Sequence, residues 1–219
     1  MKIKTFGGYS ENPLCSSYLI ENNKEAFIID PGCYDFSCGF IRNLPENIKL
    51  KGVILTHCHI DHMLYAKNVA NHYNIPILAS KSDKILALAF PIQYKLYFKG
   101  QEQRNVINAP LKIDQYIKDG DILTLGGLEI KVISTPGHSP GSISLYIPEE
   151  NILFSGDTIF AGSVGRTDFP FSNENIFIKT INDKILTLPE DTTVYCGHSN
   201  YGIPTFKLKD WITWWKSFN

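Results

Sequence analysis

The sequence predicts a four-layer α/β sandwich, in which two halves rich in βα units pack face to face within one domain over residues 1–219. Two internal similarities support this fold. Residues 17–30 and 142–157 both read as strand, acidic turn, strand and a final aspartate. Residues 53–55 and 193–196 are both apolar strands that lead into a histidine, His57 or His198. With 43% apolar and 20% charged residues, the chain has the composition of an ordinary globular protein, which argues against disorder.

The first half alternates short apolar strands with turns and helical patterns. A hairpin is expected at residues 17–29, where two apolar runs flank a polar turn. Residues 52–55 form a fully apolar run, which is typical of a strand buried on both faces. The other elements expected here are a helix at 36–44 that ends near Pro45, a helix at 63–73, a strand at 75–79 and a helix begun by a capping-box-like pair, Ser80 and Asp83.

The second half is expected to contain two hairpins and a terminal helix. Paired glycines, Gly126-Gly127, predict the turn of a hairpin at residues 122–133, and a second hairpin is expected at 142–157. For residues 90–109 we favour an amphipathic surface helix over a lid above a binding site. A core-docked helix is predicted at 208–219 from one apolar face, formed by Leu208, Trp211, Ile212, Trp215 and Phe218.

Composition and charge exclude several classes of function. Lys plus Arg is 21 and Asp plus Glu is 22, so a net charge of −1 offers no field to attract nucleic acid or an anionic membrane. The apolar runs are far shorter than the ~20 residues that span a bilayer, and residues 1–8 do not resemble a secretory signal. Five cysteines without framework spacing indicate free thiols and a cytoplasmic protein. The oligomeric state is left open.

The most informative stretch follows the buried strand and reads T-H-C-H-I-D-H, residues 56–62. It holds three of the chain's six histidines and one aspartate, and imidazole and carboxylate groups are ligands for zinc, iron and manganese. So short a run hardly supplies four ligands to one catalytic ion while a position stays open for water, so a two-metal site is the natural alternative. A solvated polar loop is the competing interpretation.

Three further candidate ligands each follow a predicted strand. His138 lies in T-P-G-H-S-P-G-S, residues 135–142, and His198 lies in G-H-S. The glycine before each histidine allows a positive φ, which can aim the side chain into a cleft. Asp157 ends the apolar strand 152–156, although taken alone it reads as an N-cap or an Asx turn. The sixth histidine, His72, is expected on the surface or in packing.

In order and spacing, the H-x-H-x-D-H run, the later G-H-S-P-G-S, the G-D-T and the final G-H resemble the metallo-β-lactamase fold. The resemblance covers nearly the whole chain and implies an αββα sandwich with two mixed sheets, helices outside and a metal site at one edge. It also implies two divalent metal ions as cofactors, zinc first, with iron and manganese as alternatives. The implied ligands are His57, His59 and His138 for one metal, Asp61, His62 and His198 for the other, and Asp157 as the bridge.

Within that superfamily the chain is most similar to glyoxalase II (hydroxyacylglutathione hydrolase), in a compact form without the C-terminal helical domain. The segment G-R-T-D, residues 165–168, resembles a signature of short bacterial relatives, and many zinc β-lactamases carry a cysteine where Asp157 stands. The resemblance implies hydrolysis of a small glutathione-derived thioester, such as S-lactoylglutathione, to a hydroxy acid and a thiol. A hydroxide held between the metals would attack the carbonyl carbon, and Asp61 would orient it. No substrate-binding residue is assigned.

Other functions stay open at this point. Persulfide dioxygenases share the T-H-C-H-x-D-H run and the G-R-T-D segment, and they would use one iron held by His57, Asp157 and either His138 or His59 to oxidise glutathione persulfide. A non-enzymatic, degenerate metal-binding domain is disfavoured because every expected ligand is present. A nuclease of the same superfamily is disfavoured because the chain has no surplus of basic residues.

Supporting residues are predicted around the candidate ligands. Asp30, at a strand end, is expected either to accept a proton from a ligand imidazole and so fix its tautomer, or to be a plain turn aspartate. The same two alternatives, support of a ligand or a purely local role, apply to Thr56. Cys58 and Cys196 are expected as buried filler thiols. Arg166 and Asp168 are expected to form a salt bridge that shapes the mouth of the site.

Overall fold

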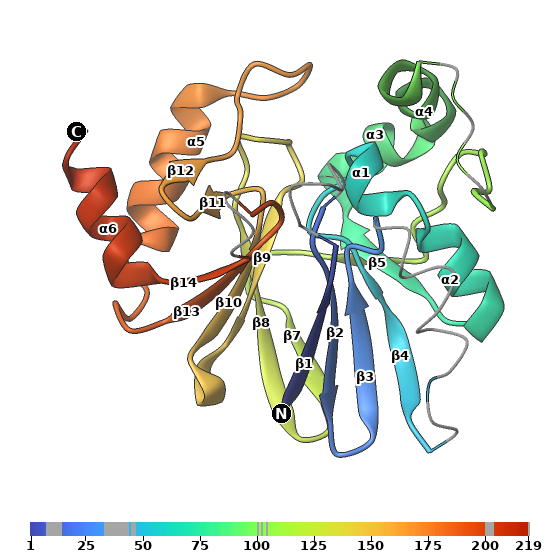
Figure 1. Ribbon diagram of the computed structural model, residues 1–219, viewed down its shortest axis with the longest axis horizontal. Helices are drawn as coiled ribbons and strands as arrows, with labels where there is room; N and C mark the ends of the chain where they lie inside the picture. Colours follow the sequence, from blue (N-terminus) through green and yellow to red (C-terminus); the bar gives the residue numbers. More distant parts are fainter. Residues whose placement is uncertain are drawn as a thin grey trace.

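The computed structural model describes residues 1–7, 15–32, 44, 47–99, 101, 103, 105–199 and 204–218. Two six-stranded sheets pack face to face, and helices cover the outer face of each (Figure 1). The predicted four-layer α/β sandwich with two mixed sheets is therefore confirmed. The helix expected at 36–44 falls almost wholly outside the described residues.

The first sheet has the strand order β1-β2-β3-β4-β5-β6. Strand β2 is antiparallel to both of its neighbours, β1 and β3, and its pairing with β3 confirms the predicted hairpin. Strands β3, β4, β5 and β6 are joined in parallel pairs. The bounds are β1 Lys2–Phe6, β2 Ser17–Asn22, β3 Glu25–Ile29, β4 Lys49–Ile54, β5 Ile77–Ser80 and β6 Gln115–Ile117.

The second sheet has the strand order β14-β13-β10-β9-β8-β7, and it contains both predicted hairpins, β7–β8 and β9–β10. Its one parallel pair among the described strands is β10 with β13. A separate two-stranded ribbon follows β10. The bounds are β7 Ile122–Leu125, β8 Leu128–Ser134, β9 Ile143–Ile147, β10 Ile152–Gly156, β11 Ile159–Phe160, β12 Ser163–Val164, β13 Thr193–Cys196 and β14 Thr205–Lys207.

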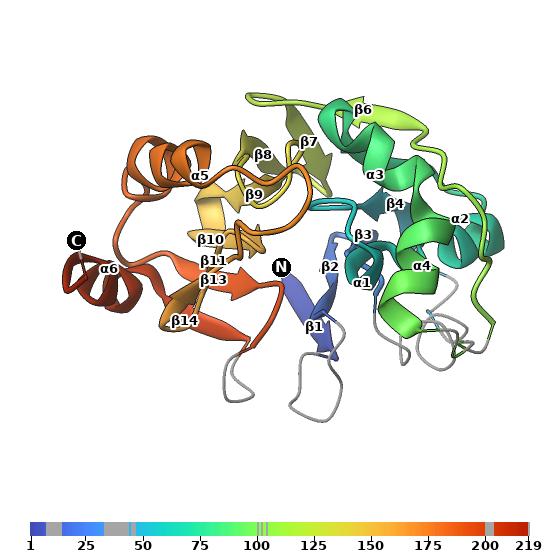
Figure 2. The same ribbon diagram turned by 90° about the horizontal axis from the view of Figure 1, so that it is seen from above.

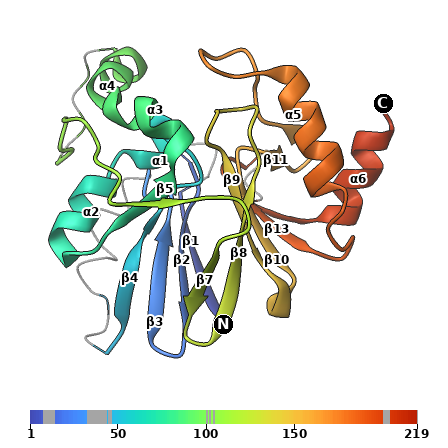
Figure 3. The same cartoon turned by 180° about the vertical axis from the view of Figure 1, so that it is seen from behind.

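The helices form the two outer layers, as the views from above and from behind show (Figure 2, Figure 3). The first sheet is covered by α1 Ile60–Met63, α2 Ala66–Tyr73, the short turn η3 Lys81–Asp83, α3 Lys84–Leu88 and α4 Phe90–Phe98. The second sheet is covered by α5 Glu174–Thr180 with its continuation η5 Ile181–Ile185, and by α6 Leu208–Lys216. The turn η4 Pro148–Glu150 joins β9 to β10.

Three apolar cores separate the four layers, because alternate residues of a strand face opposite sides of its sheet. On β2, Leu19 faces the helices of the first half, whereas Ile20 faces the second sheet. Phe154 of β10 lies in the core between the sheets, and Leu153 packs with Trp211 of α6 in the third core. The two sheets are therefore held together by a continuous apolar layer.

The predicted helix at 63–73 is wrong in its continuity. The chain forms α1 and α2 with a break at Leu64 and Tyr65. The backbone N–H of Tyr65 donates to the carbonyl of Pro31 at 2.9 Å, outside the helix. This tertiary hydrogen bond turns the chain and separates the segment that carries Asp61 and His62 from the segment packed on the sheet.

The strand expected at 75–79 and the terminal helix are confirmed with shifted bounds, and the helix expected over 90–109 is confirmed only in part. The strand expected at 75–79 begins after Pro76, and the terminal helix ends at Lys216, which leaves Phe218 72% exposed rather than on the docked face. Of the amphipathic surface helix expected over 90–109, only α4, Phe90–Phe98, is helical among the described residues. It buries Phe90 and Tyr94 but exposes the apolar Ile92 and Leu96, so the expected amphipathic pattern is wrong. Within the described part of the chain, none of the helices combines the length and apolarity needed to traverse a bilayer. The three described cysteines are free.

Candidate metal centre

All seven candidate ligands of the sequence are brought close together. The strands that precede them, β4, β8, β10 and β13, end at the same side of the sandwich (Figure 1). The loop after β4 carries His57 and His59, and α1 carries Asp61 and His62. The second half contributes three residues that follow β8, β10 and β13: His138, Asp157 and His198. Residues far apart in the chain therefore converge because the sheets bring their strand ends to one edge.

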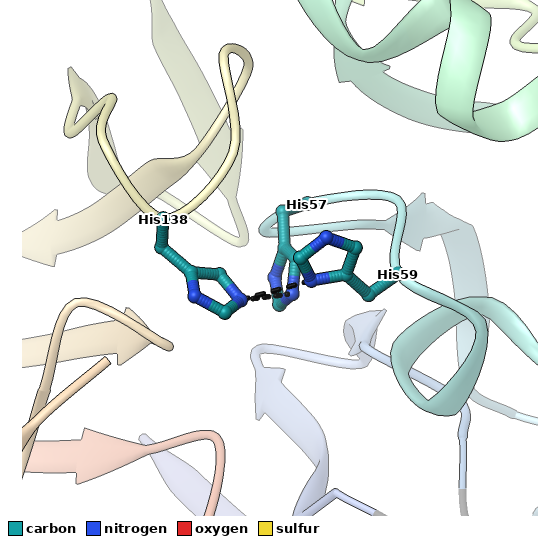
Figure 4. Close-up of side chains that lie close together, drawn as sticks. All are labelled: His57, His59 and His138. Atoms are coloured by element: carbon teal, nitrogen blue, oxygen red, sulfur yellow. Dashed lines mark hydrogen bonds between the residues drawn. The ribbon is translucent and has the colours of Figure 1, made fainter. Parts of the chain in front are cut away.

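The first group consists of His57, His59 and His138, and their ring nitrogens converge on one point (Figure 4). His138 Nε2 lies 2.9 Å from His59 Nδ1 and 3.2 Å from His57 Nε2. Ligands at 2.0–2.1 Å from a tetrahedral zinc are about 3.3 Å apart, so these spacings suit a shared cation. The grouping matches the three ligands that the family resemblance implied for one metal.

The second group consists of Asp61, His62 and His198. His198 Nε2 lies 3.1 Å from Asp61 Oδ2 and 3.3 Å from His62 Nε2. This is the second ligand set that the resemblance implied. His72 lies apart from both groups, exposed on α2, as expected.

Asp157 lies between the two groups. Its Oδ1 is 3.1 Å from His62 Nε2, and its Oδ2 is 3.5 Å from both His138 Nε2 and His198 Nε2. Despite that proximity, Oδ1 is buried without a well-directed hydrogen bond among the described residues. A buried carboxylate oxygen without a donor is costly, and a cation would satisfy it. The donor set and this oxygen both fit divalent metal ions.

Glycines keep the space around the Asp157 carboxylate open. A Cβ at Gly197 would lie 2.8 Å from His62 Cε1 and would collide with Asp157 Oδ1. Gly156 has a φ of +51°, which a residue with a side chain rarely adopts, and a Cβ there would lie 2.5 Å from Thr56 Oγ1. The G-D-T segment therefore needs glycine for its positive φ and for close approach, whereas the G-H segment needs it for close approach alone. The positive φ expected before each histidine is present at Gly137 and absent at Gly197.

The first group and the carboxylates have protonation states that suit cation binding, whereas the second group's histidines favour the protonated form without a metal. Burial lowers the pKa of His57 well below its usual value, and burial with the neighbouring His138 lowers the pKa of His59 to about 4. Burial raises the pKa of the Asp61 and Asp157 carboxyls, but the neighbouring His198 and His62 lower it by a larger amount. The net shift of both carboxyl pKa values is therefore downward. Neutral imidazoles and ionised carboxylates are the forms that bind metal. Burial lowers the pKa of His62 and His198, but neighbouring groups, Asp157 among them, raise it more, so a cation must displace their protons.

Asp30 makes the contact with a ligand imidazole that its position suggested. Its Oδ2 lies 2.9 Å from His62 Nδ1, while its two oxygens accept from the backbone N–H and the hydroxyl of Thr56 at 2.7 and 2.6 Å. The Thr56 hydroxyl is also 3.2 Å from His57 Nδ1. An acceptor beside Nδ1 keeps the proton on that nitrogen and leaves Nε2 free.

Asp83 does not complete the capping box that the sequence predicted. Ser80 caps η3 by accepting from the N–H of Ser82, but the Asp83 side chain makes no cap hydrogen bond to α3. It is fully buried and accepts instead from the loops that carry His57, His59 and His138. Sequence reasoning missed this because the spacing of Ser80 and Asp83 is a genuine local signal, and the partners are distant in the chain.

The G-R-T-D segment lies against the first group. The predicted ion pair is confirmed: Arg166 Nη2 lies 2.8 Å from Asp168 Oδ2. The carbonyl of Arg166 is 2.7 Å from His138 Nδ1, and the ring of Phe169 contacts the rings of His59 and His138. These backbone and ring contacts were not predicted, since a loop sequence does not reveal which carbonyl faces a histidine.

Comparisons with known proteins agree with the fold. The profile of the Metallo-beta-lactamase superfamily matches residues 12–198. Hydroxyacylglutathione hydrolase GloC of Haemophilus influenzae is 33% identical over 187 residues, which cover 84% of this chain and 85% of that protein. The crystal structure of BLEG-1 B3 metallo-beta-lactamase superimposes with a TM-score of 0.80 at 29% identity, covering 97% of each chain. The structure of TTHA1623 in a di-iron-bound form gives 0.77 at 27% identity over 96% of each chain.

Proposed function

The chain belongs to the metallo-beta-lactamase superfamily, and from that premise we propose that it is a dinuclear metal-dependent hydrolase of a small thioester, such as S-lactoylglutathione. The superfamily fold implies divalent metal binding. The named relative GloC supports a glutathione-derived thioester, because similarity extends over most of both chains. Zinc is the metal that we propose first, with iron and manganese as alternatives, since imidazole and carboxylate ligands suit all three.

The position of Asp157 is the observation that carries this proposal. One carboxylate lies within 3.5 Å of a histidine of the first group and of two histidines of the second. A carboxylate shared in this way suits two neighbouring cations better than one. We therefore propose the first group as one metal site, the second group as the other, and Asp157 as the bridge.

The residues of the chain have separate tasks in the proposed reaction. Divalent cations bound at the two groups would lower the pKa of water to about 7 and polarise a carbonyl oxygen. Asp61, held by His198, presents a carboxylate oxygen that can accept a hydrogen bond from the attacking water and orient it. The leaving thiol has an ordinary pKa of about 8.5, so it can depart as a thiolate without a strong general acid.

The test combines metal counting with thiol release. The purified protein is loaded separately with zinc, iron and manganese, and bound metal and hydrolysis of S-lactoylglutathione are measured for each form. We expect about two equivalents of metal and thiol release without oxygen. The Asp157→Asn variant should lose hydrolysis, whereas Asp119→Asn, which changes a surface carboxylate paired with Lys184, should keep it.

Other outcomes would replace the proposal with a different function. One equivalent of iron together with oxygen uptake on glutathione persulfide would indicate a mononuclear dioxygenase. Hydrolysis of a cephalosporin with no action on the thioester would indicate a β-lactamase. Absence of turnover with every metal and all three substrates would favour a non-enzymatic metal-binding domain.

A further inference from the structure

The buried carboxylate of Asp83 lies outside both candidate metal groups. Asp83 ends η3, and its side chain is 0% exposed. Because an ionised carboxylate is costly to bury without partners, its contacts identify what it is there to hold. It makes no side-chain cap to the helix that follows it, so local structure does not explain it.

Its partners come from the two loops that carry the first group. Oδ2 accepts from the backbone N–H of Cys58 and from the hydroxyl of Ser139, each at 2.8 Å. Oδ1 accepts from the backbone N–H of Gly141 at 2.6 Å. Cys58 stands between His57 and His59, and Ser139 directly follows His138. One carboxylate therefore joins the loop of the first half to the loop of the second half beside all three histidines.

The chemistry of these contacts requires an acceptor with two oxygens. The N–H groups of Cys58 and Gly141 can only donate, and each is bonded to a different oxygen of Asp83. An asparagine has one oxygen, so its amide N–H would face one of these donors. Close approach is also built into the site, since a Cβ at Gly141 would lie 2.7 Å from Asp83 Oδ1.

The second group is supported by a different carboxylate. Asp30 contacts His62 directly, and none of the hydrogen bonds described for Asp83 reaches Asp61, His62 or His198. Loss of the Asp83 carboxylate should therefore disturb one group and spare the other. A residue with only a general structural role would affect both.

We propose that Asp83 is a positioning residue for the first histidine group: it ties the His57–His59 loop to the His138 loop and thereby sets the affinity of that group for a cation. The inference rests on the metal assignment of the proposed function, but not on the identity of the substrate. Replacement of groups that support metal ligands typically costs about 10- to 100-fold in metal affinity.

The experiment measures zinc affinity by chelator competition in two backgrounds. His198→Ala disrupts the second group and leaves the first, whereas His59→Ala disrupts the first and leaves the second. Adding Asp83→Asn should weaken zinc binding about 10- to 100-fold in the His198→Ala background and leave it unchanged in the His59→Ala background. Asp114→Asn is the matched control, because that carboxylate accepts from the Ile77 N–H in the same half, away from the ligand loops.

Each result decides the question. Equal losses in both backgrounds, or no loss in the His198→Ala background, would overturn the inference. If neither background binds zinc with Asp83 intact, the metal assignment of the proposed function fails and the inference fails with it. If Asp83→Asn does not fold, Ser139→Ala is the alternative variant, because it removes one of the three donors to Asp83. It should weaken the zinc affinity of the first group about fivefold, as expected for one ordinary hydrogen bond. An unchanged affinity in that variant would also overturn the inference.

Discussion

Replacing Asp30 with asparagine should switch the ring tautomer of His62. The Asp30 carboxylate accepts from the Thr56 N–H at 2.7 Å and from the Thr56 hydroxyl at 2.6 Å, and it lies 2.9 Å from His62 Nδ1. In the variant, the amide oxygen must face the Thr56 N–H, because two donors cannot pair. The amide N–H then points at His62 Nδ1, which becomes the acceptor, and the ring proton moves to Nε2, the nitrogen that faces His198.

The size of the effect follows from these contacts. Backbone strain adds little, because Asp30 has a φ of 47° and asparagine tolerates that conformation as well as aspartate. A lost partner of a ligand histidine costs about 10- to 100-fold in metal affinity, or about 1.4–2.7 kcal/mol. The metal-free protein should also lose about 1.5–3 kcal/mol of unfolding free energy, the range for a hydrogen bond to a charged group.

Two measurements test this reasoning. Nitrogen NMR of the imidazoles in the metal-free protein, recorded at a pH above the raised pKa of His62 so that the ring is neutral, reports its tautomer. Chelator competition in the His59→Ala background reports the zinc affinity of the second group. Thr56→Ser keeps the hydroxyl and should change neither. If Asp30→Asn keeps the proton on Nδ1 and binds zinc as tightly as its parent, then Asp30 does not set the tautomer.

Three further outcomes are expected. The pKa of His59 is lowered from 6.5 to about 4 in the native state. As pH falls from 6.5 to 4, the unfolded chain therefore binds a proton at His59 that the native state does not bind. The metal-free protein should therefore lose stability between pH 6.5 and 4, and denaturant titrations that show constant stability there would contradict this. Gly197→Ala should abolish zinc binding by the second group, because its Cβ would meet His62 and Asp157; retained affinity in the His59→Ala background would refute this. Phe154→Ala, which empties part of the core between the sheets, should cost about 3–5 kcal/mol in unfolding free energy yet leave the metal stoichiometry of the folded protein unchanged.

The strands, and the candidate ligands that follow them, were predictable from sequence because both signals are local. Apolar runs such as residues 52–55 identify buried strands, and turn residues fix where they end. Polar residues placed directly after several such strands must then gather where the strand ends meet. The structure brings His57 and His138 within 3.2 Å of each other in this way, although 81 positions separate them.

Supporting contacts were less predictable because distant partners decide them. Asp83 has the spacing of a helix cap, yet its partners lie 25 to 58 positions away. The break between α1 and α2 likewise depends on a hydrogen bond from Tyr65 to Pro31, which periodicity cannot reveal. In both cases a local sequence pattern gave way to a contact between residues distant in the chain, which periodicity and spacing do not encode.

Both candidate groups contain residues from each half of the sandwich, and this links metal binding to the stability of the folded protein. When only one half has folded, a cation finds at most two of the three side chains of either group: two from the first half, or one from the second. A metal ion would then bind tightly only after the two halves have assembled, and each bound ion would oppose separation of the halves. Under metal starvation the expected symptom is thus earlier destruction by cellular proteases, in addition to an idle catalyst.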